Sequence, residues 1–302
     1  PEVLAFRSLQ AQTATLISGA HALHFMTRAS VTSTELDLHV HLRHRRDIGT
    51  WLLTSGYSFI PTLAQHPDFH LHIVGDTYRR ATTRTPSGVC DVVTFQKAQS
   101  GGSTLNVRMI VSWTTPAATI LCSPSTCLLN VITFNTAYCL FPRATLHERR
   151  ALLLRYPDGS PIEPENVAEQ HDALGFEPPL SHLEARQVTS IASNLSFPLG
   201  WRWIDDAATW VVSLDTVGVS GPLPANKHST AMTHDPVSVC NYAIRYDSER
   251  GAWMDLGVAH ASVLRYSYII SDELLIDKLC HAIEKKVEEE RRKAEPALEG
   301  HR

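Results

Sequence analysis

The sequence predicts a mixed fold, α/β passing to α+β, in which a sheet flanked by helices precedes a second α+β region. Strand-like and helix-like segments alternate through the first half of the chain, as they do in mixed sheets covered by helices. Residues 35–42 alternate strictly between polar and apolar side chains, as in a strand with two different faces. After Arg155 the composition changes to a polar, proline-rich stretch, so we expect two regions, residues 1–155 and residues 156–302.

The first expected elements lie on either side of a glycine turn. Residues 13–17 predict a short strand, Ser18-Gly19-Ala20 predicts the turn, and a helical pattern follows through Met26. Residues 35–42 predict a strand with one apolar and one polar face, because successive strand side chains point to opposite sides. The polar face carries two acids and two histidines, which are Glu35, Asp37, His39 and His41.

Three further elements complete the first region. Residues 45–54 predict a helix that ends at Ser55-Gly56, where glycine suits the left-handed cap. Residues 92–97 and 105–113 are alternating runs on either side of a Gly-Ser-rich turn, which predicts a hairpin. Residues 123–142 predict the clearest helix of this region, with Pro124 at its first position and Pro142 at its end. The apolar run 127–141 would lie buried inside it.

The second region carries weaker signals. A proline-rich stretch after residue 155 predicts a linker, residues 210–214 predict a strand, and residues 218–236 predict a loop. A C-terminal helix is expected from about residue 271, with a charged end that pairs such as Glu288 and Arg292 would stabilise. We expect the tryptophans to anchor core or domain packing more readily than to stack on bases: Trp201, Trp203, Trp210 and Trp253.

Composition restricts the class of protein. The 302 residues hold 27 Lys+Arg and 31 Asp+Glu, a formal net charge of −4, so no strong nucleic-acid signal is present. No run of about 18 apolar residues occurs, and we therefore expect no membrane span. Six cysteines without C-x-x-C spacing indicate buried thiols in a reducing compartment. Together with a start that lacks a signal-peptide pattern, these features predict an intracellular protein, cytoplasmic or nuclear.

The first candidate site combines the acidic strand with the glycine turn. Two acids at positions i and i+2 of a strand place both carboxylates on one side, where Glu35 and Asp37 could bind Mg²⁺ or Mn²⁺ for phosphoryl transfer. A glycine turn upstream lets backbone N–H groups approach phosphate oxygens, which makes Gly19 and Ala20 candidate phosphate-binding residues. The alternative is a solvated acidic strand beside an ordinary strand-to-helix turn.

These residues resemble the opening of the nucleotidyltransferase (DNA polymerase β-like) superfamily, a Gly-Gly or Gly-Ser turn followed by a strand with an acid-apolar-acid pattern. Residues 17–26 and 34–40 carry the resemblance. A group of basidiomycete fungal proteins of unassigned function looks closer still, and it shares segments like 125–133 and 141–145. The resemblance covers residues 14–155 and implies a nucleotidyltransferase-like domain that binds a nucleoside triphosphate and a divalent metal at Glu35 and Asp37.

The sequence also departs from that pattern. Ala20 replaces the usual Ser or Gly, and Glu35 replaces the usual first Asp. Active members carry a third carboxylate on a later strand, but the matching residues 105–111 place Asn106 and Arg108 on the polar face. Asp91 is the one acid between residues 91 and 147, and its reach is short. Without a third acid, the metal that activates the attacking hydroxyl lacks a ligand.

A second candidate site is the sequence His39-x-His41-x-x-His44. Two histidines on one strand face can bind one metal, with Asp37 or Asp47 adding a carboxylate. The spacing resembles the H-x-H-x-D-H motif of metallo-β-lactamase-like hydrolases, although Arg43 stands at the Asp position. A further cluster would place His70 and His72 on one face, near His66. A polar strand face without a metal is the favoured alternative for both clusters.

Three functions stay open from the sequence. The chain could be an enzyme that transfers a nucleotidyl group with Mg²⁺ or Mn²⁺, and then the nucleotide would be its partner. It could instead keep that fold and bind a ligand or partner without catalysis, which the missing third carboxylate favours. A His-metal hydrolase built on His39 and His41 is the third hypothesis. Neither the substrate nor the oligomeric state follows from the residues.

Overall fold

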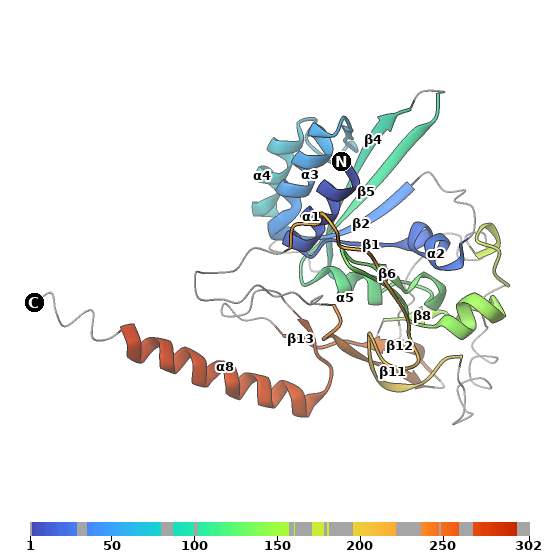
Figure 1. Ribbon diagram of the computed structural model, residues 1–302, viewed down its shortest axis with the longest axis vertical. Helices are drawn as coiled ribbons and strands as arrows, with labels where there is room; N and C mark the ends of the chain where they lie inside the picture. The colour runs from blue at the N-terminus through green and yellow to red at the C-terminus, as the bar shows by residue number, and fades with distance from the viewer. Residues whose placement is uncertain are drawn as a thin grey trace, which may run out of the picture.

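An eight-stranded mixed sheet flanked by helices is the largest element of the fold (Figure 1). The coordinates are a computed structural model, which describes residues 2–28, 35–79, 87–99, 102–156, 160, 171–177, 180, 196–221, 237–247, 249–259 and 268–294. The strand order is β10-β7-β6-β1-β2-β5-β4-β3. The strands are β1 (Leu16–Ser18), β2 (Glu35–His41), β3 (Ser58–Ile60), β4 (Val89–Ala98), β5 (Thr104–Ser112), β6 (Asn130–Ile132), β7 (Thr136–Cys139) and β10 (Trp210–Ser213).

Helices cover both faces of this sheet. The apolar side of β2, with Leu38 and Val40, packs against Ile48 and Leu52 of α3 in one core cluster. On the other face, Leu16 of β1 packs against α5 in a second cluster. The helices of this region are α1 (Glu2–Thr13), α2 (Gly19–Thr27), α3 (Arg45–Thr54), α4 (Phe69–Arg79) and α5 (Pro116–Leu121), with short turns η1 (Leu42–His44), η3 (Thr126–Leu128) and η4 (Arg143–Glu148).

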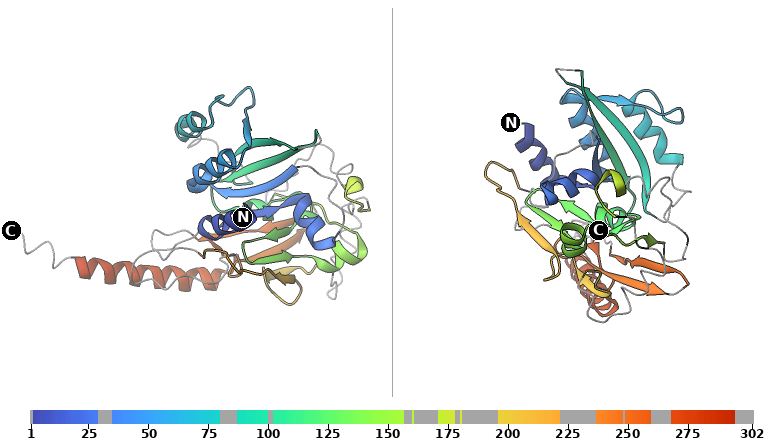
Figure 2. Two further views of the ribbon diagram at one scale, coloured as in Figure 1. Left: turned by 45° about the horizontal axis from the view of Figure 1, so that its top comes forward. Right: turned by 90° about the vertical axis from the view of Figure 1, so that its right-hand side faces the viewer.

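A second sheet and a long helix follow. The four strands lie in the order β8-β12-β11-β9, and a two-stranded pair β13-β14 stands beside them. Figure 2 shows helix α8 extending away from the rest of the molecule. The bounds are β8 (Leu154–Arg155), β9 (Gly200–Trp203), β11 (Asn241–Asp247), β12 (Gly251–Asp255), β13 (Val258–Ala259), β14 (Tyr268–Ile269) and α8 (Glu273–Ala294).

Each of the two sequence regions contributes a strand to the main sheet of the other. From the second region, β10 pairs with β7 and extends the large sheet, and from the first, β8 pairs with β12. One buried cluster includes Leu16 and Ile120 together with Tyr242 and Ile269. Pairing and packing therefore cross residue 155, where the sequence analysis divides the chain.

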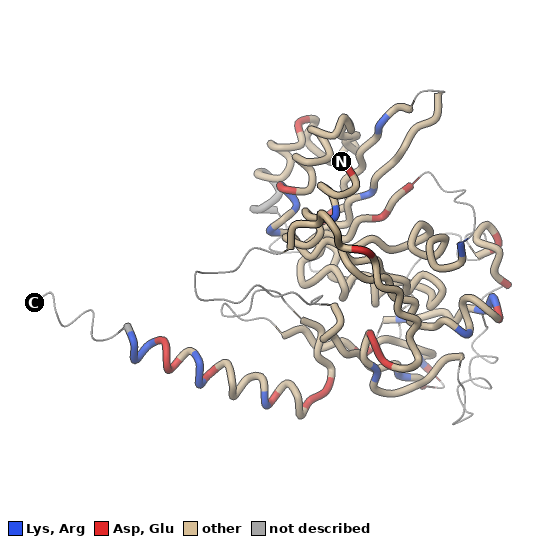
Figure 3. The backbone as a smooth tube through the Cα atoms, in the orientation of Figure 1, with Lys and Arg blue, Asp and Glu red and all other residues tan. Residues whose placement is uncertain are grey.

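Several sequence predictions are confirmed. The alternating run at 35–42 forms β2, the segment 45–54 forms α3, and the two runs of the expected hairpin pair antiparallel as β4 and β5. Gly56 has a φ of 86°, as the expected left-handed cap requires. In α8, Arg292 donates to Glu288 at 2.7 Å, and Figure 3 shows the alternating charges along this helix. No helix of the described ranges is both long and apolar enough for a bilayer.

The predicted helix at 123–142 is wrong. This segment forms η3 and the hairpin strands β6 and β7. A short buried apolar run has the same composition in a strand and in a helix, so periodicity does not separate them. The β-branched residues Val131, Ile132 and Thr133, followed by a turn at Asn135, favour the hairpin. The helix α1 is a further difference, because the sequence pattern predicts no element before residue 13.

Candidate functional site

Glu35 and Asp37 lie on the same face of β2, as the sequence predicts. Strand β5 runs parallel to β2, and its Asn106 and Arg108 stand directly beside Glu35 and Asp37. Neighbouring residues in register point to the same side of a sheet. The four side chains therefore form one polar block, in which the side chain of Asp37 is 14% exposed and that of Glu35 is 43% exposed.

Arg108 binds the carboxylate of Asp37 through two hydrogen bonds. Its Nε donates to Oδ1 at 2.7 Å and its Nη2 donates to Oδ2 at 2.9 Å, while Nη1 lies 3.5 Å from Oε2 of Glu35. Burial alone would lower the pKa of Arg108, but the hydrogen bonds and charge of Asp37 outweigh it and raise the pKa. A bidentate guanidinium and carboxylate form one of the strongest polar pairs in proteins.

The Gly19 bend lies against the same carboxylate. Gly19 has a φ of 70° and begins α2 directly after β1, whose Ser18 pairs with Asp37. A Cβ atom at residue 19 would lie 2.4 Å from Oδ2 of Asp37. The chain therefore brings the predicted turn and the predicted acid together, with Ala20 half-buried in the first turn of α2.

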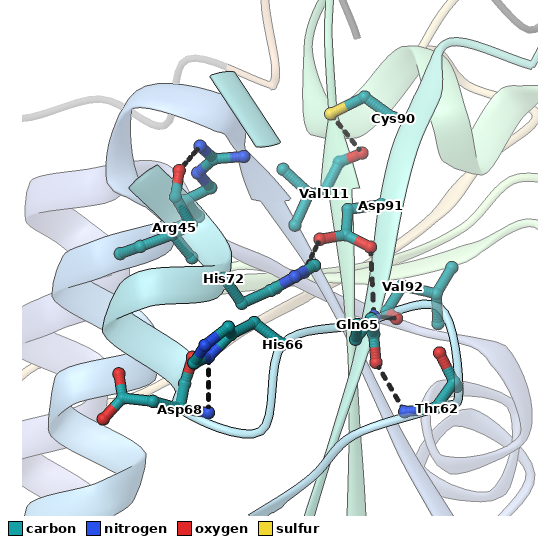
Figure 4. Close-up of polar contacts among 11 residues, drawn as sticks. Arg45, Thr62, Gln65, His66, Asp68, His72, Cys90, Asp91, Val92 and Val111 are labelled. Atoms are coloured by element: carbon teal, nitrogen blue, oxygen red, sulfur yellow. Dashed lines mark hydrogen bonds and ion pairs between the residues drawn. The ribbon is translucent and has the colours of Figure 1, made fainter. Parts of the chain in front are cut away.

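Asp91 points away from this block. It is on the face of β4 that carries Val93 and Phe95, which is the opposite face of the sheet. There the Nε2 of His72 lies 2.8 Å from Oδ2 of Asp91, and both side chains are buried. Gln65 donates to Oδ1 at 3.3 Å, as Figure 4 shows. Asp91 thus fixes α4 against β4 and is not a third carboxylate for Asp37.

The histidine clusters do not converge on a metal. His39 is buried, and its Nδ1 lies 2.8 Å from the hydroxyl of Thr119 in α5. Because that hydroxyl donates to the carbonyl oxygen of Pro116, it accepts the Nδ1–H of His39. The Nδ1 of His41 accepts from the backbone of Arg43, and His44 pairs with Asp47. No group of three or more His, Cys, Asp or Glu among the described residues could hold a metal ion.

The interpretation of His70 and His72 as one face is wrong. Both belong to helix α4, where residues two apart point in different directions. His72 is buried against Asp91, whereas His70 is exposed. The tryptophans also differ from expectation, because three of them are about half exposed: Trp201, Trp203 and Trp210.

The acidic strand does not fit a pair of divalent ions. A two-metal site needs several carboxylate oxygens that face the ions. Here both oxygens of Asp37 already accept hydrogen bonds from Arg108, and the guanidinium charge stands where a third acid would be needed. A fixed positive charge at that place repels a cation. Asn106 supplies only an amide, and its Oδ1 is buried with no hydrogen-bond partner in the described structure.

The other face of the sheet carries cavities, within the part of the chain that the structure describes, that were not predicted from the sequence. One of about 580 Å³ lies along α2, and its lining includes His21, His24 and Arg28. The spacing 21, 24, 28 along one helix face was the available signal. A smaller cavity of about 210 Å³ lies between α1 and α3, beside Phe6 and Trp51.

Comparisons with protein families, curated proteins and solved structures find no match to this chain.

Proposed function

We propose that this protein has a nucleotidyltransferase-like fold and acts as a ligand-binding protein without two-metal catalysis. Four features support the fold assignment. A glycine bend leads from β1 into α2, an acid-apolar-acid strand follows, and the bend touches the second acid. The parallel pairing of β5 with β2 also supports the proposal, because the resemblance implies a third carboxylate on a later strand next to the first two.

We infer the absence of two-metal catalysis from a single observation, the pair of hydrogen bonds that Arg108 donates to Asp37. In such catalysis the carboxylates hold the ions that activate the nucleophile and stabilise the leaving group. In this chain an arginine occupies the place of the third acid and neutralises the second. Arginine keeps its charge at any physiological pH, so the pair stays intact without a metal.

The experiment is calorimetry with Mn²⁺ and then with ATP, on the wild-type protein and on Arg108→Asp. We expect no binding of Mn²⁺ by the wild type. The variant brings a third carboxylate beside Glu35 and Asp37 and removes the guanidinium, so we expect it to bind Mn²⁺. Asp37→Ala added to the variant should abolish that binding.

Arg245→Asp is the matched control. Arg245 is also a strand arginine paired with an acid, at 3.4 Å from Asp255, and its side chain has the same exposure as Arg108, 41% against 40%. It lies in the second sheet, so its replacement should leave the protein without Mn²⁺ affinity. Metal-dependent ATP binding by the wild type, lost in Asp37→Ala, would contradict the proposal and restore the catalytic hypothesis.

A further inference from the structure

The cavity along α2 is large enough for a small molecule. Its volume of about 580 Å³ falls within the range of about 300–1,000 Å³ that ligand sites occupy. Its floor is the face of the large sheet that carries Ile17, Leu36 and Val212, and Trp210 stands at the edge strand. Ile17 pairs with Leu38, one residue from Asp37, so the cavity faces away from the Asp37–Arg108 pair.

Two histidines of α2 line this apolar cavity, and each also has a buried nitrogen atom without a partner in the described structure. His21 and His24 lie on the cavity side of α2, and the Nδ1 atoms of both are buried without a hydrogen-bond partner among the described residues. His24 as a whole residue is only 6% exposed. Buried polar atoms almost always have a partner, and one that lacks it calls for an explanation such as a ligand.

The charge in the cavity comes from one residue. Arg28 closes α2 one turn after His24 and is the one permanently charged side chain among the described lining residues. Burial, and then the neighbouring His21, lower the pKa of His24, so its imidazole is neutral near pH 7. The cavity therefore combines apolar walls, hydrogen-bonding imidazoles and a single cation.

We propose that the cavity binds a small apolar molecule that carries one carboxylate. The apolar body would lie against the sheet, and the carboxylate would accept hydrogen bonds from the imidazoles and pair with Arg28. A single cation balances a monovalent head group, whereas a phosphate dianion would leave one charge uncompensated beside apolar walls. This inference deepens the proposed ligand-binding function by naming the site and the chemical class of the ligand.

The test uses decanoate as the probe and decanol as its uncharged counterpart, both titrated calorimetrically into the full chain at pH 7.5. We expect saturable binding of one decanoate per chain, at least about tenfold tighter than decanol, since hydrogen bonds to a charged group are the stronger ones. Trp210 lines the cavity, so its fluorescence should change on binding, and Trp210→Phe should remove that change.

Two variants test the head-group contacts. Arg28→Asn suits the left-handed backbone at this residue, where φ is 55°, and His24→Leu replaces the unpartnered imidazole with an apolar side chain. Each should weaken decanoate binding about tenfold and leave decanol binding within about twofold. Arg149→Asn is the matched control, because Arg149 also ends a helix with a positive φ of 51° but does not line the cavity.

Equal affinity for decanoate and decanol would overturn the inference, as would unchanged decanoate binding in Arg28→Asn or the absence of saturable binding. Should His24→Leu fail to fold, Arg28→Asn decides alone, since its side chain is exposed at the helix end. Calorimetry with Mn²⁺ and ATP reports on the Asp37–Arg108 pair on the opposite face. Failure of one proposal can therefore be told apart from failure of the other.

Discussion

Gly19 carries two separate constraints in a single residue. Its φ of 70° lies in the left-handed region, where a side chain adds strain. Its Cα also faces the carboxylate of Asp37 so closely that a methyl group would overlap Oδ2. The sequence could predict a turn at this glycine, but not the contact, because the contact depends on how β1 registers with β2.

Gly19→Ala should therefore lower the free energy of unfolding by more than backbone strain alone, which costs about 1–3 kcal/mol. Gly200→Ala is the control, since Gly200 also has a positive φ, of 94°, but a Cβ atom there would meet nothing within 4 Å. Urea denaturation measures both variants against the wild type. If both variants lose the same free energy of unfolding, the side chain of Asp37 moves away from the new methyl group without an energetic cost, and the prediction is wrong.

Arg108 is the residue at which the sequence predicted most about the site. Its place in an alternating run puts it on the polar face, where the sequence shows an arginine and no acid. Its two hydrogen bonds to Asp37 could not be predicted from the sequence, because they need β5 to lie parallel to β2 with residues 108 and 37 side by side. Pairing between strands far apart in sequence is set by tertiary structure.

Among the elements, β2 is fixed by contacts on both of its faces. Leu38 and Val40 pack toward α3, while His39 on the other face meets Thr119 of α5. The alternation of β2 was predictable because one face is apolar and the other polar. Helix α5 was not predicted, since its six residues are too few to show a helical period. The hairpin of β6 and β7 was mistaken for a helix because both of its strands are buried.

The buried contact between β2 and α5 makes stability depend on pH. Burial lowers the pKa of His39 to about 4, with Asp37 raising it and Arg108 lowering it, against an ordinary value of 6.5. Below pH 6.5 His39 becomes protonated in the unfolded chain but stays neutral in the folded protein. The contribution of His39 to the free energy of unfolding is therefore complete above pH 6.5 and is lost as the pH falls toward 4. At pH 5 the loss from this residue is about 2 kcal/mol.

The measurement is urea denaturation at pH 7.5 and pH 5 for the wild type and for His39→Gln. Burial also lowers the pKa of His24 and His171, so the wild type should lose more than the share of His39. The difference between the two proteins isolates residue 39, and His39→Gln should show the smaller loss. His70→Gln, at an exposed histidine, should behave as the wild type. The same pH dependence in all three proteins would rule out His39 as its source.

At the scale of the whole molecule, the two sequence regions build one another's sheets. Strand β10 is the edge strand of the large sheet next to β7, and β8 is an edge strand of the second sheet. The change in composition after Arg155 marks the start of a polar, proline-rich stretch, but it carries no information about which strands pair. The shared cluster around Tyr242 and Ile120 contains residues from both sides of that point. Apolar burial on this scale is the main favourable term in folding.

Residues 1–155 expressed alone should therefore fail to fold cooperatively. The fragment would lack β10, which covers β7, and the second-region half of the shared cluster, so buried side chains such as Leu140 and Leu152 would lose their partners. Thermal unfolding by circular dichroism, with dispersion of the amide NMR spectrum, compares the fragment with the full chain. Co-expression with residues 156–302 is the control, and it should restore the cooperative transition because both sheets can then form. A fragment that unfolds cooperatively near the temperature of the full chain would instead establish residues 1–155 as an independent domain, with β10 and the shared cluster adding little to its stability.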